Sequence, residues 1–235
     1  MKPELITFPD IPNILPEHPI ISIAGAGGKT TLMFELAKTL PGIVVTTTTT
    51  KVGETQIMSA NQQMTFDQFP PGKPSKIIWV SPSLQPQNGK ISGFSKEAFP
   101  PLAEICRAHG WPILLETDGA ACRHIKAPAA HEPNIPAQSN VSFTLVGLDT
   151  LGCPINPEFV HRPEIFTRLT ETKPNNLITI HSIIKLLEHP EGGLKNIPPN
   201  ALRIAYLTHA ASDERITAAK SIAQQLQHYD YVCIH

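Results

Sequence analysis

An apolar segment that runs directly into a glycine-rich loop constrains this chain more than any other feature. Residues 19–23 read Pro-Ile-Ile-Ser-Ile, which is typical of a buried strand, and the loop follows at residues 25–30. Beyond the loop, apolar side chains recur at a helical spacing, so we expect an amphipathic helix over residues 30–40. A strand, a glycine turn and a helix in this order indicate a βα unit of an α/β protein.

The rest of the chain repeats this alternation and predicts the fold class. We expect a three-layer α/β/α domain with a mostly parallel sheet, formed as a single domain over residues 1–235. Residues 1–18 form an N-terminal extension in this interpretation, and the long loops within 117–163 form a substrate site, because α/β proteins place their chemistry at strand ends. The further strands are expected at 43–45, 77–80, 112–116, 143–146, 204–207 and 231–234, with helices at 101–108 and after Ser212.

The loop contains the groups that hold the phosphates of a nucleoside triphosphate. Glycines let backbone N–H groups point at the phosphates, the helix N-terminus adds its dipole, a lysine reaches the outer phosphates and a threonine hydroxyl binds Mg²⁺. The candidate nucleotide-binding residues are Gly25, Ala26, Gly27, Gly28, Lys29, Thr30 and Thr31. The usual spacing G-x-x-x-x-G-K-[ST] is not met, because Ile23 stands at the first glycine position and the loop is two residues shorter. The alternative is a glycine turn before a helix that happens to begin with Lys-Thr.

Two carboxylates follow the apolar strand at 112–115. Glu116 and Asp118 are two residues apart, so on an extended chain they point the same way. We expect Asp118 to bind Mg²⁺ with Thr30, and Glu116 to orient water or act as a base beside Lys29, although the order of the two carboxylates could be reversed. The alternative is that one or both carboxylates cap the turn that follows.

A run of five threonines and a lysine ends another strand. Thr49, Thr50 and Lys51 would lie beside the phosphates, where a hydroxyl could bind Mg²⁺ and the ammonium could balance charge. The alternative is a β-strand with one hydrated face, because threonine favours strands.

Polar side chains also gather in the two long loops. We expect a substrate pocket there, opposite the nucleotide, although each side chain alone could simply brace a loop. The candidate substrate residues are Lys126, His131, Glu132, Asp149, His161 and Arg162.

Composition excludes several classes of protein. The net charge of −1 and the lack of a Lys/Arg cluster argue against nucleic acid as a partner. The first 19 residues lack the apolar core of a signal peptide, and no apolar run is long enough to span a membrane, so we expect a cytoplasmic protein. The cysteines show no C-x-x-C pair, so reduced buried thiols are expected rather than a zinc or selenium site. They are Cys106, Cys122, Cys153 and Cys233.

A set of short motifs resembles one family. The motifs are the loop at 24–31, the threonine run with Lys51, Glu116-x-Asp118-Gly-Ala, Lys126-Ala-Pro-Ala-x-His131-Glu132-Pro, Gly147-Leu-Asp149-x-Leu-Gly and His161-Arg162-Pro-Glu. Together the motifs resemble the YqeC-like proteins of selenium-cofactor biosynthesis, also described as accessory proteins of selenium-dependent molybdenum hydroxylases. The resemblance implies a P-loop NTPase-like protein that uses a nucleotide and Mg²⁺ to help mature a molybdenum enzyme, with that hydroxylase or its maturation proteins as partners.

One segment departs from the pattern that the resemblance implies. Relatives tend to carry an Asn-Lys-x-Asp-like stretch after the strand at 203–207, whereas this chain has Thr208-His209-Ala210-Ala211. The amide and carboxylate that would pair with guanine are missing, which favours ATP over GTP.

Two other functions stay open at the level of sequence. The short loop also resembles the G-T-N-G-K-T-T loop of ATP-dependent amide ligases, which suggests a ligase or a small-molecule kinase. A nucleotide-gated chaperone or binding module with negligible turnover is the alternative from a different class.

Overall fold

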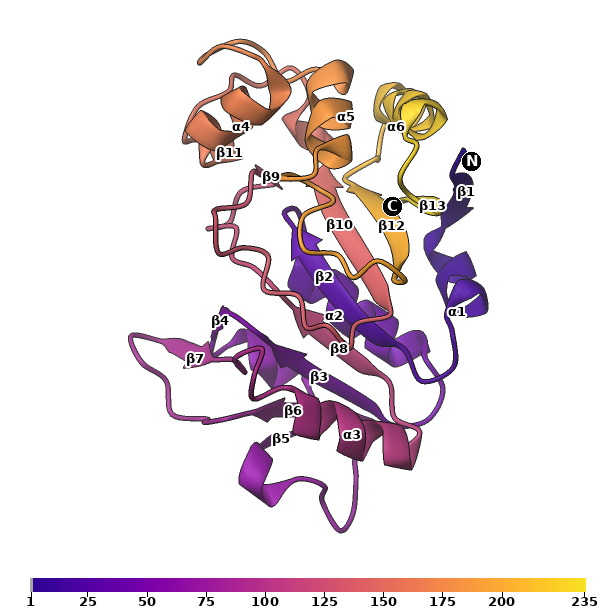
Figure 1. Ribbon diagram of the computed structural model, residues 1–235, viewed down its shortest axis with the longest axis vertical. Helices are drawn as coiled ribbons and strands as arrows, with labels where there is room; N and C mark the ends of the chain where they lie inside the picture. Colours follow the sequence, from indigo (N-terminus) through magenta and orange to yellow (C-terminus); the bar gives the residue numbers. More distant parts are fainter. Residues whose placement is uncertain (1) are drawn as a thin grey trace.

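The computed structural model describes residues 2–235 as a nine-stranded parallel sheet between two layers of helices (Figure 1). The sheet has the order β1-β13-β12-β10-β2-β8-β3-β6-β5. Its strands are β1 (Glu4–Thr7), β2 (Ile20–Gly25), β3 (Val44–Thr48), β5 (Gln62–Thr65), β6 (Ile77–Ser81), β8 (Ile113–Glu116), β10 (Val141–Gly147), β12 (Leu202–Thr208) and β13 (Tyr231–Ile234). The three-layer α/β class predicted from the alternation of apolar runs is therefore confirmed.

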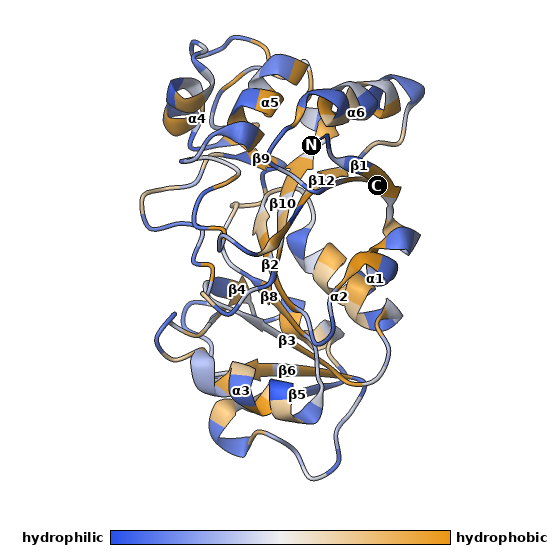
Figure 2. Ribbon diagram, turned by 45° about the vertical axis from the view of Figure 1, so that its right-hand side comes forward, coloured by the Kyte–Doolittle hydropathy of each residue, from blue (hydrophilic) through white to orange (hydrophobic). Residues whose placement is uncertain are grey.

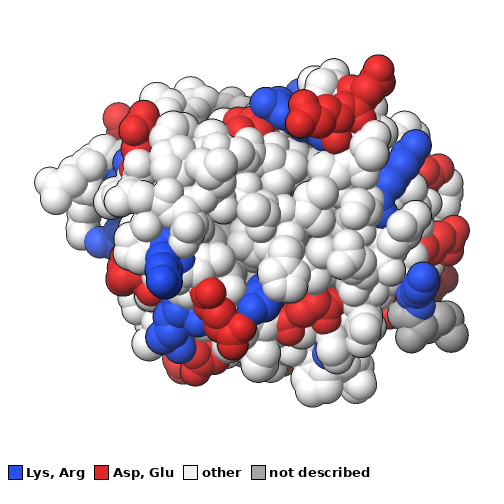
Figure 3. All heavy atoms as spheres, turned by 90° about the horizontal axis from the view of Figure 1, so that it is seen from above, with Lys and Arg blue, Asp and Glu red and all other residues white. Residues whose placement is uncertain are grey.

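The helices divide between the two faces of the sheet. They are α1 (Ile11–Ile14), α2 (Lys29–Thr39), α3 (Pro100–His109), α4 (Pro163–Thr170), α5 (Ile180–Glu188) and α6 (Asp213–Gln225). Because successive side chains of a strand face opposite sides, Leu114 packs with α1 and α2, whereas its neighbours Ile113 and Leu115 pack with α3. On the same face as α3, the helices α4, α5 and α6 cover β10, β12 and β13. Apolar colour runs through most of the central strands in Figure 2, as burial on both faces requires, whereas acidic and basic side chains lie in small separate groups on the outer face drawn in Figure 3.

Two small sheets lie outside the main one. β9 (Ile125–Lys126) pairs in parallel with β11 (Val160–His161), and β4 (Lys51–Gly53) pairs antiparallel with β7 (Lys90–Ser92). The β4–β7 ribbon follows β3 directly, and Phe94 N donates to Thr48 O at 2.9 Å, so the ribbon is tied to the end of that strand. These small sheets fold the long loops onto the carboxyl edge of the main sheet.

The threonine run is not a strand with one hydrated face, so that alternative was wrong. Thr46, Thr47 and Thr48 are fully buried. Helices and loops cover both faces of β3, so each hydroxyl must find an internal partner. Thr46 donates to Ile78 O, Thr47 to Val80 O and Thr48 to Glu116 O.

Several elements were not expected from the sequence, and β1, β5, α4 and α5 are the main ones. β1 lies within residues 1–18, which the sequence analysis set apart as an extension, and it forms the edge strand beside β13. β5 forms the other edge, and α4 and α5 follow the second long loop. Within residues 2–235, none of the helices is both long and apolar enough to cross a bilayer.

Candidate functional site

The glycine loop joins β2 to α2 at the carboxyl edge of the sheet, between β8 and β10. Gly25 has a φ of +91°, and a Cβ added there would lie 2.3 Å from Leu145 O on β10. Gly27 has a φ of +96°, and a Cβ there would lie 2.9 Å from Thr208 Oγ1. Both positions therefore require glycine, for the backbone angle and for the close approach to neighbouring strands. The loop is therefore packed directly against β10 and the end of β12.

Lys29, the first residue of α2, is folded back onto this loop. Its Nζ donates to Gly25 O at 2.8 Å and lies 3.3 Å from Asp118 Oδ1, and the side chain is buried. The other oxygen of Asp118 accepts from Gly25 N at 3.1 Å and lies 3.0 Å from Lys126 Nζ. Asp118 thus stands between two ammonium groups and holds both beside the loop.

Glu116, rather than Asp118, lies next to the hydroxyl that would bind a metal. Thr30 Oγ1 donates a hydrogen bond to Glu116 Oε1 and accepts one from Gln56 Nε2 at 3.0 Å. Burial raises the pKa of Glu116, and the nearby Asp118 carboxylate adds to this, while Lys29 and the Thr30 hydroxyl act in the opposite direction. A hydroxyl and a carboxylate in contact form the two-oxygen arrangement that Mg²⁺ uses in such sites.

Gln56 is a site residue that sequence reasoning missed. Its Oε1 accepts from Gly53 N at 2.7 Å, which ties the end of β4 to the start of α2. A single glutamine in a polar stretch carries no pattern that could have pointed to this contact.

The end of the threonine run contributes less than expected to the phosphate side. Thr49 Oγ1 donates to Asn134 O at 2.7 Å, and Asn134 Nδ2 returns a bond to Thr49 O at 3.1 Å. The Thr49 hydroxyl therefore braces the loop after β8. Thr50 is half-buried and Lys51 is exposed, and both line a cleft described below.

Three of the six candidate substrate residues join Asp118 in one buried charge network. Lys126 Nζ lies 2.8 Å from Glu132 Oε2, and Arg162 grips the same carboxylate with Nη1 at 2.6 Å and Nη2 at 3.2 Å. Burial acts to raise the pKa of Glu132, but the hydrogen bonds and charges of Arg162 and Lys126 outweigh it and set the pKa at about 2. The β9–β11 pairing places Lys126 opposite His161, which precedes Arg162, so the two loops are joined at this point.

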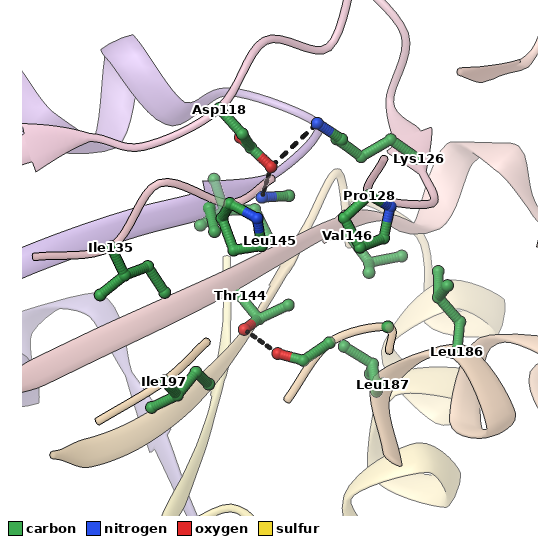
Figure 4. A pocket seen from close by; sticks show the side chains of 15 residues that line it. Asp118, Lys126, Pro128, Ile135, Thr144, Leu145, Val146, Leu186, Leu187 and Ile197 are labelled. Atoms are coloured by element: carbon green, nitrogen blue, oxygen red, sulfur yellow. Dashed lines mark hydrogen bonds and ion pairs between the residues drawn. The ribbon is translucent and has the colours of Figure 1, made fainter. Parts of the chain in front are cut away.

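Beneath Lys126, the structure encloses a small apolar cavity. Figure 4 shows Lys126 reaching Asp118 above the side chains of Ile135, Leu145 and Leu186. The cavity has a volume of ≈ 20 Å³, which is room for about one water molecule. It is therefore not a substrate site.

The remaining three substrate candidates contribute no ion pair to this network. His161 lines the open cleft, and burial together with the charges of Arg162 and Lys126 lowers its pKa. His131 is exposed on the loop before Glu132. Asp149 lies on the other flank of the glycine loop, in the turn that follows β10.

Asp149 belongs to a cluster with two histidines that were not expected. Its Oδ2 lies 2.5 Å from His124 Nδ1, and the ring of His124 stacks on that of His209 with centroids 4.5 Å apart and planes 9° from parallel. One possible ligand atom from each residue lies within 4.8 Å of the others. Parallel rings aim their nitrogen lone pairs side by side rather than at one point. In this arrangement the cluster is therefore a stacked pair oriented by a carboxylate, and it would need a ring rotation to coordinate a metal ion.

The cysteines differ from one another in exposure. Cys106 and Cys233 are buried, and burial raises the pKa of each thiol to about 12. Cys153 is half-buried, but Cys122 is exposed, so the expectation of four buried thiols was wrong at that position. Cys122 lies in a loop between β8 and β9 with a φ of +58°, where no hydrophobic element covers it.

Comparison with known proteins places this architecture in a family. The family model described as YqeC protein matches residues 21–164. The uncharacterized protein YqeC of Escherichia coli (strain K12) is 32% identical over 224 residues, which cover 92% of this chain and 85% of that protein. The chain belongs to the YqeC family. No solved structure matches it.

The YqeC match extends over most of the site described above. Residues 21–164 include the glycine loop, both carboxylates after β8, and the Lys126–Glu132–Arg162 network. His209 and the strand β12 lie beyond the region matched by the YqeC model, although the alignment with the Escherichia coli protein spans most of the chain.

Proposed function

We propose that this protein binds a nucleoside triphosphate with Mg²⁺ on the loop from Gly25 to Thr31 and hydrolyses it or transfers its outer phosphoryl group. The observation that carries the proposal is the contact between Thr30 and Glu116 beside a buried Lys29 at the N-terminus of α2. A hydroxyl, a carboxylate and an ammonium at the end of a glycine loop are the groups that a magnesium–phosphate complex requires.

In this proposal the two lysines and two carboxylates have separate roles. Lys29 exchanges Gly25 O for the outer phosphates, because a phosphate oxygen offers it a stronger, charge-assisted bond than a carbonyl. Thr30 and Glu116 bind the Mg²⁺, and Asp118 orients Lys29. This reverses the first choice made from the sequence, in which Asp118 bound the metal, and adopts the alternative order.

ATP is the nucleotide that we favour. The segment after β12 offers Thr208, His209 and two alanines where guanine recognition would need an amide and a carboxylate. Adenine needs neither of these groups, and the stacked His124–His209 pair provides a flat face on the same flank of the loop.

We further propose that the bound nucleotide serves maturation of a selenium-dependent molybdenum hydroxylase. Membership in the YqeC family supports an accessory role. The resemblance of the sequence motifs suggests that this role is the maturation of a selenium-dependent molybdenum hydroxylase. Phosphoryl transfer, as in a ligase or small-molecule kinase, is the second candidate. An open cleft beside the outer-phosphate end of the loop favours it over a chaperone with negligible turnover.

Binding of MgATP by Lys29→Ala tests the core of the proposal. We expect an affinity at least about tenfold below that of the wild-type protein, and a rate of ATP hydrolysis lower by about 10²–10³, because the charge-stabilising group is lost. Lys38→Ala is the matched control, since Lys38 lies exposed on the same helix. Calorimetric binding equal in Lys29→Ala and wild type would rule the proposal out.

The biological role needs a separate test in cells. Loss of the gene should abolish the activity of a selenium-dependent molybdenum hydroxylase in a host that has one, with molybdenum enzymes that lack selenium unaffected. The wild-type gene should restore that activity, and the Lys29→Ala gene should not. If both genes restored the hydroxylase activity, the accessory role would not depend on nucleotide binding.

A further inference from the structure

An open cleft lies on the β3–β8 side of the glycine loop and is the largest space next to the candidate site. Its volume is ≈ 620 Å³, and its walls come from the end of β3, the β4–β7 ribbon and the loops after β8 and β11. Gly119, which follows Asp118, lines it, as do Glu132 and Arg162 of the buried charge network. The cleft therefore adjoins the charge network through which Asp118 contacts Lys29 of the glycine loop.

The β4–β7 ribbon presents two lysines to this cleft by its register. Lys51 pairs with Ser92 and Gly53 pairs with Lys90 in an antiparallel ladder. Because side chains alternate along each strand, Lys51, Lys90 and Ser92 share one face of the ribbon. Val52 and Ile91, on the opposite face, are buried in the main hydrophobic core. Because Val52 and Ile91 anchor the apolar face in the core, the opposite face, which carries Lys51 and Lys90, is turned toward the cleft.

The positive charge in the cleft is not neutralised by the protein. Neither Lys51 nor Lys90 forms an ion pair with an acidic side chain in the part of the chain that the structure describes. The one carboxylate in the wall, Glu132, is already shared between Lys126 and Arg162. Burial lowers the pKa of His161 in the same wall, and the charges of Arg162 and Lys126 lower it further, whereas Glu132 and Asp118 act in the opposite direction.

Hydroxyl groups complete the lining. Thr50, Ser92 and Ser95 face the same space as the two lysines and Arg162. Ammonium groups, a guanidinium and hydroxyls together form the set that holds phosphate oxygens, which accept several charge-assisted hydrogen bonds at once. Two unpaired lysines match the two negative charges of a phosphomonoester.

We propose that this cleft binds the phosphomonoester group of a small organic molecule, as a second substrate beside the nucleotide. Binding of the phosphomonoester rests on the cleft alone, and its role as a substrate rests on the proposed function. Lys51 and Lys90 hold the phosphate group, and Arg162, fixed by Glu132, holds the part of the molecule nearest the glycine loop.

Calorimetric titration with glycerol 2-phosphate, with and without saturating MgADP, tests the proposal on the full chain. We expect saturable binding by the wild-type protein, weakened about tenfold in Lys51→Gln and again in the Lys51→Gln/Lys90→Gln double variant. Lys220→Gln, which removes an exposed lysine on α6, is the control and should bind as the wild type does. Succinate, a dianion without phosphate, should bind at least about tenfold more weakly.

Three results with glycerol 2-phosphate itself would overturn the proposal. The first is that glycerol 2-phosphate does not bind saturably at about 10 mM. The second is that the double variant binds it as the wild type does. The third is that Lys29→Ala loses binding while the double variant keeps it. The last would place the phosphate on the glycine loop and leave the proposed function standing. Conversely, Lys51-dependent binding in a protein that binds no MgATP would support the cleft site while refuting the nucleotide site. If succinate bound as tightly as glycerol 2-phosphate, the cleft would not select a phosphate group, and the proposal would also fail.

Discussion

The ammonium of Lys29 lies 3.3 Å from the buried carboxylate of Asp118, whose second oxygen lies 3.0 Å from Lys126. One carboxylate thus links the start of α2 to the loop that carries Glu132 and Arg162. The glycine loop and the neighbouring cleft wall are therefore parts of one electrostatic unit, and a change at Asp118 should affect both.

Asp118→Asn should destabilise the protein by about 3–5 kcal/mol, because it leaves two buried ammonium groups without their shared partner. The free energy of unfolding from urea titration measures this loss. Asp67→Asn, at an exposed position, should change stability by less than about 0.5 kcal/mol. Equal stabilities for the two variants would show that the buried ion pairs do not hold the loops together.

Glu116→Gln should remove most of the magnesium dependence of nucleotide binding. Glu116 accepts the Thr30 hydrogen bond, and an amide is a far poorer Mg²⁺ ligand than a carboxylate. We expect ATP affinity in Mg²⁺ to fall by about tenfold or more, with affinity in EDTA unchanged. Glu35→Gln, a partly exposed position on α2, is the control. If Asp118→Asn rather than Glu116→Gln abolished the magnesium effect, the first order inferred from the sequence would be correct.

The sequence predicted those parts of the molecule whose signals are local. An apolar strand, glycines and a 3.6-residue stripe lie together in residues 19–40, and they locate β2, the loop and α2. β1 and β5 were missed because they are four-residue edge strands with only one buried side chain each. α5 does carry local signals that could have located it, namely an apolar stripe and a Thr179–Ser182 capping box.

The arrangement of the site depends on pairings between distant segments. The Lys126–Glu132–Arg162 network requires two strands of two residues each to pair although the paired residues are 35 positions apart, and no local pattern encodes such a contact. The two lysines of the cleft meet because β4 pairs with β7, which follows it after 36 intervening residues. Sequence reasoning could name residues of the correct chemistry, but their neighbours depended on the tertiary fold.

Lowering the pH should protonate Glu132 and thereby reduce the free energy of unfolding. Its pKa in the folded protein is about 2, below the ordinary value of 4.5, so the stabilisation is complete above about pH 4.5 and is lost as the pH falls toward 2. The fall in pKa from 4.5 to about 2 corresponds to roughly 3 kcal/mol. Glu132→Gln should be less stable than the wild type at pH 7, and the two stabilities should converge near pH 2. A constant difference across the whole range would contradict this assignment.

Gly25→Ala should prevent stable formation of the loop. The new methyl group would lie 2.3 Å from Leu145 O, and the backbone angle of +91° is strained for alanine. We expect a loss of about 3 kcal/mol or more, together with loss of nucleotide binding. Gly72→Ala meets no atom within 4 Å and has an ordinary backbone angle, so its melting temperature should match that of the wild type. Equal melting temperatures for both variants would show that the loop is not seated against β10.

Thiol chemistry should separate Cys122 from the buried cysteines. Cys106 and Cys233 are buried with pKa values near 12, so they offer almost no thiolate at pH 8, whereas Cys122 is exposed. In the native protein, a chromogenic disulfide reagent should modify Cys122 at least about a hundredfold faster than Cys106 or Cys233. Cys122→Ser should remove this fast phase, and Cys106→Ser should leave it in place. Denaturant should make all four thiols reactive, and a fast phase that survives Cys122→Ser would mean that a second thiol is accessible in the folded chain.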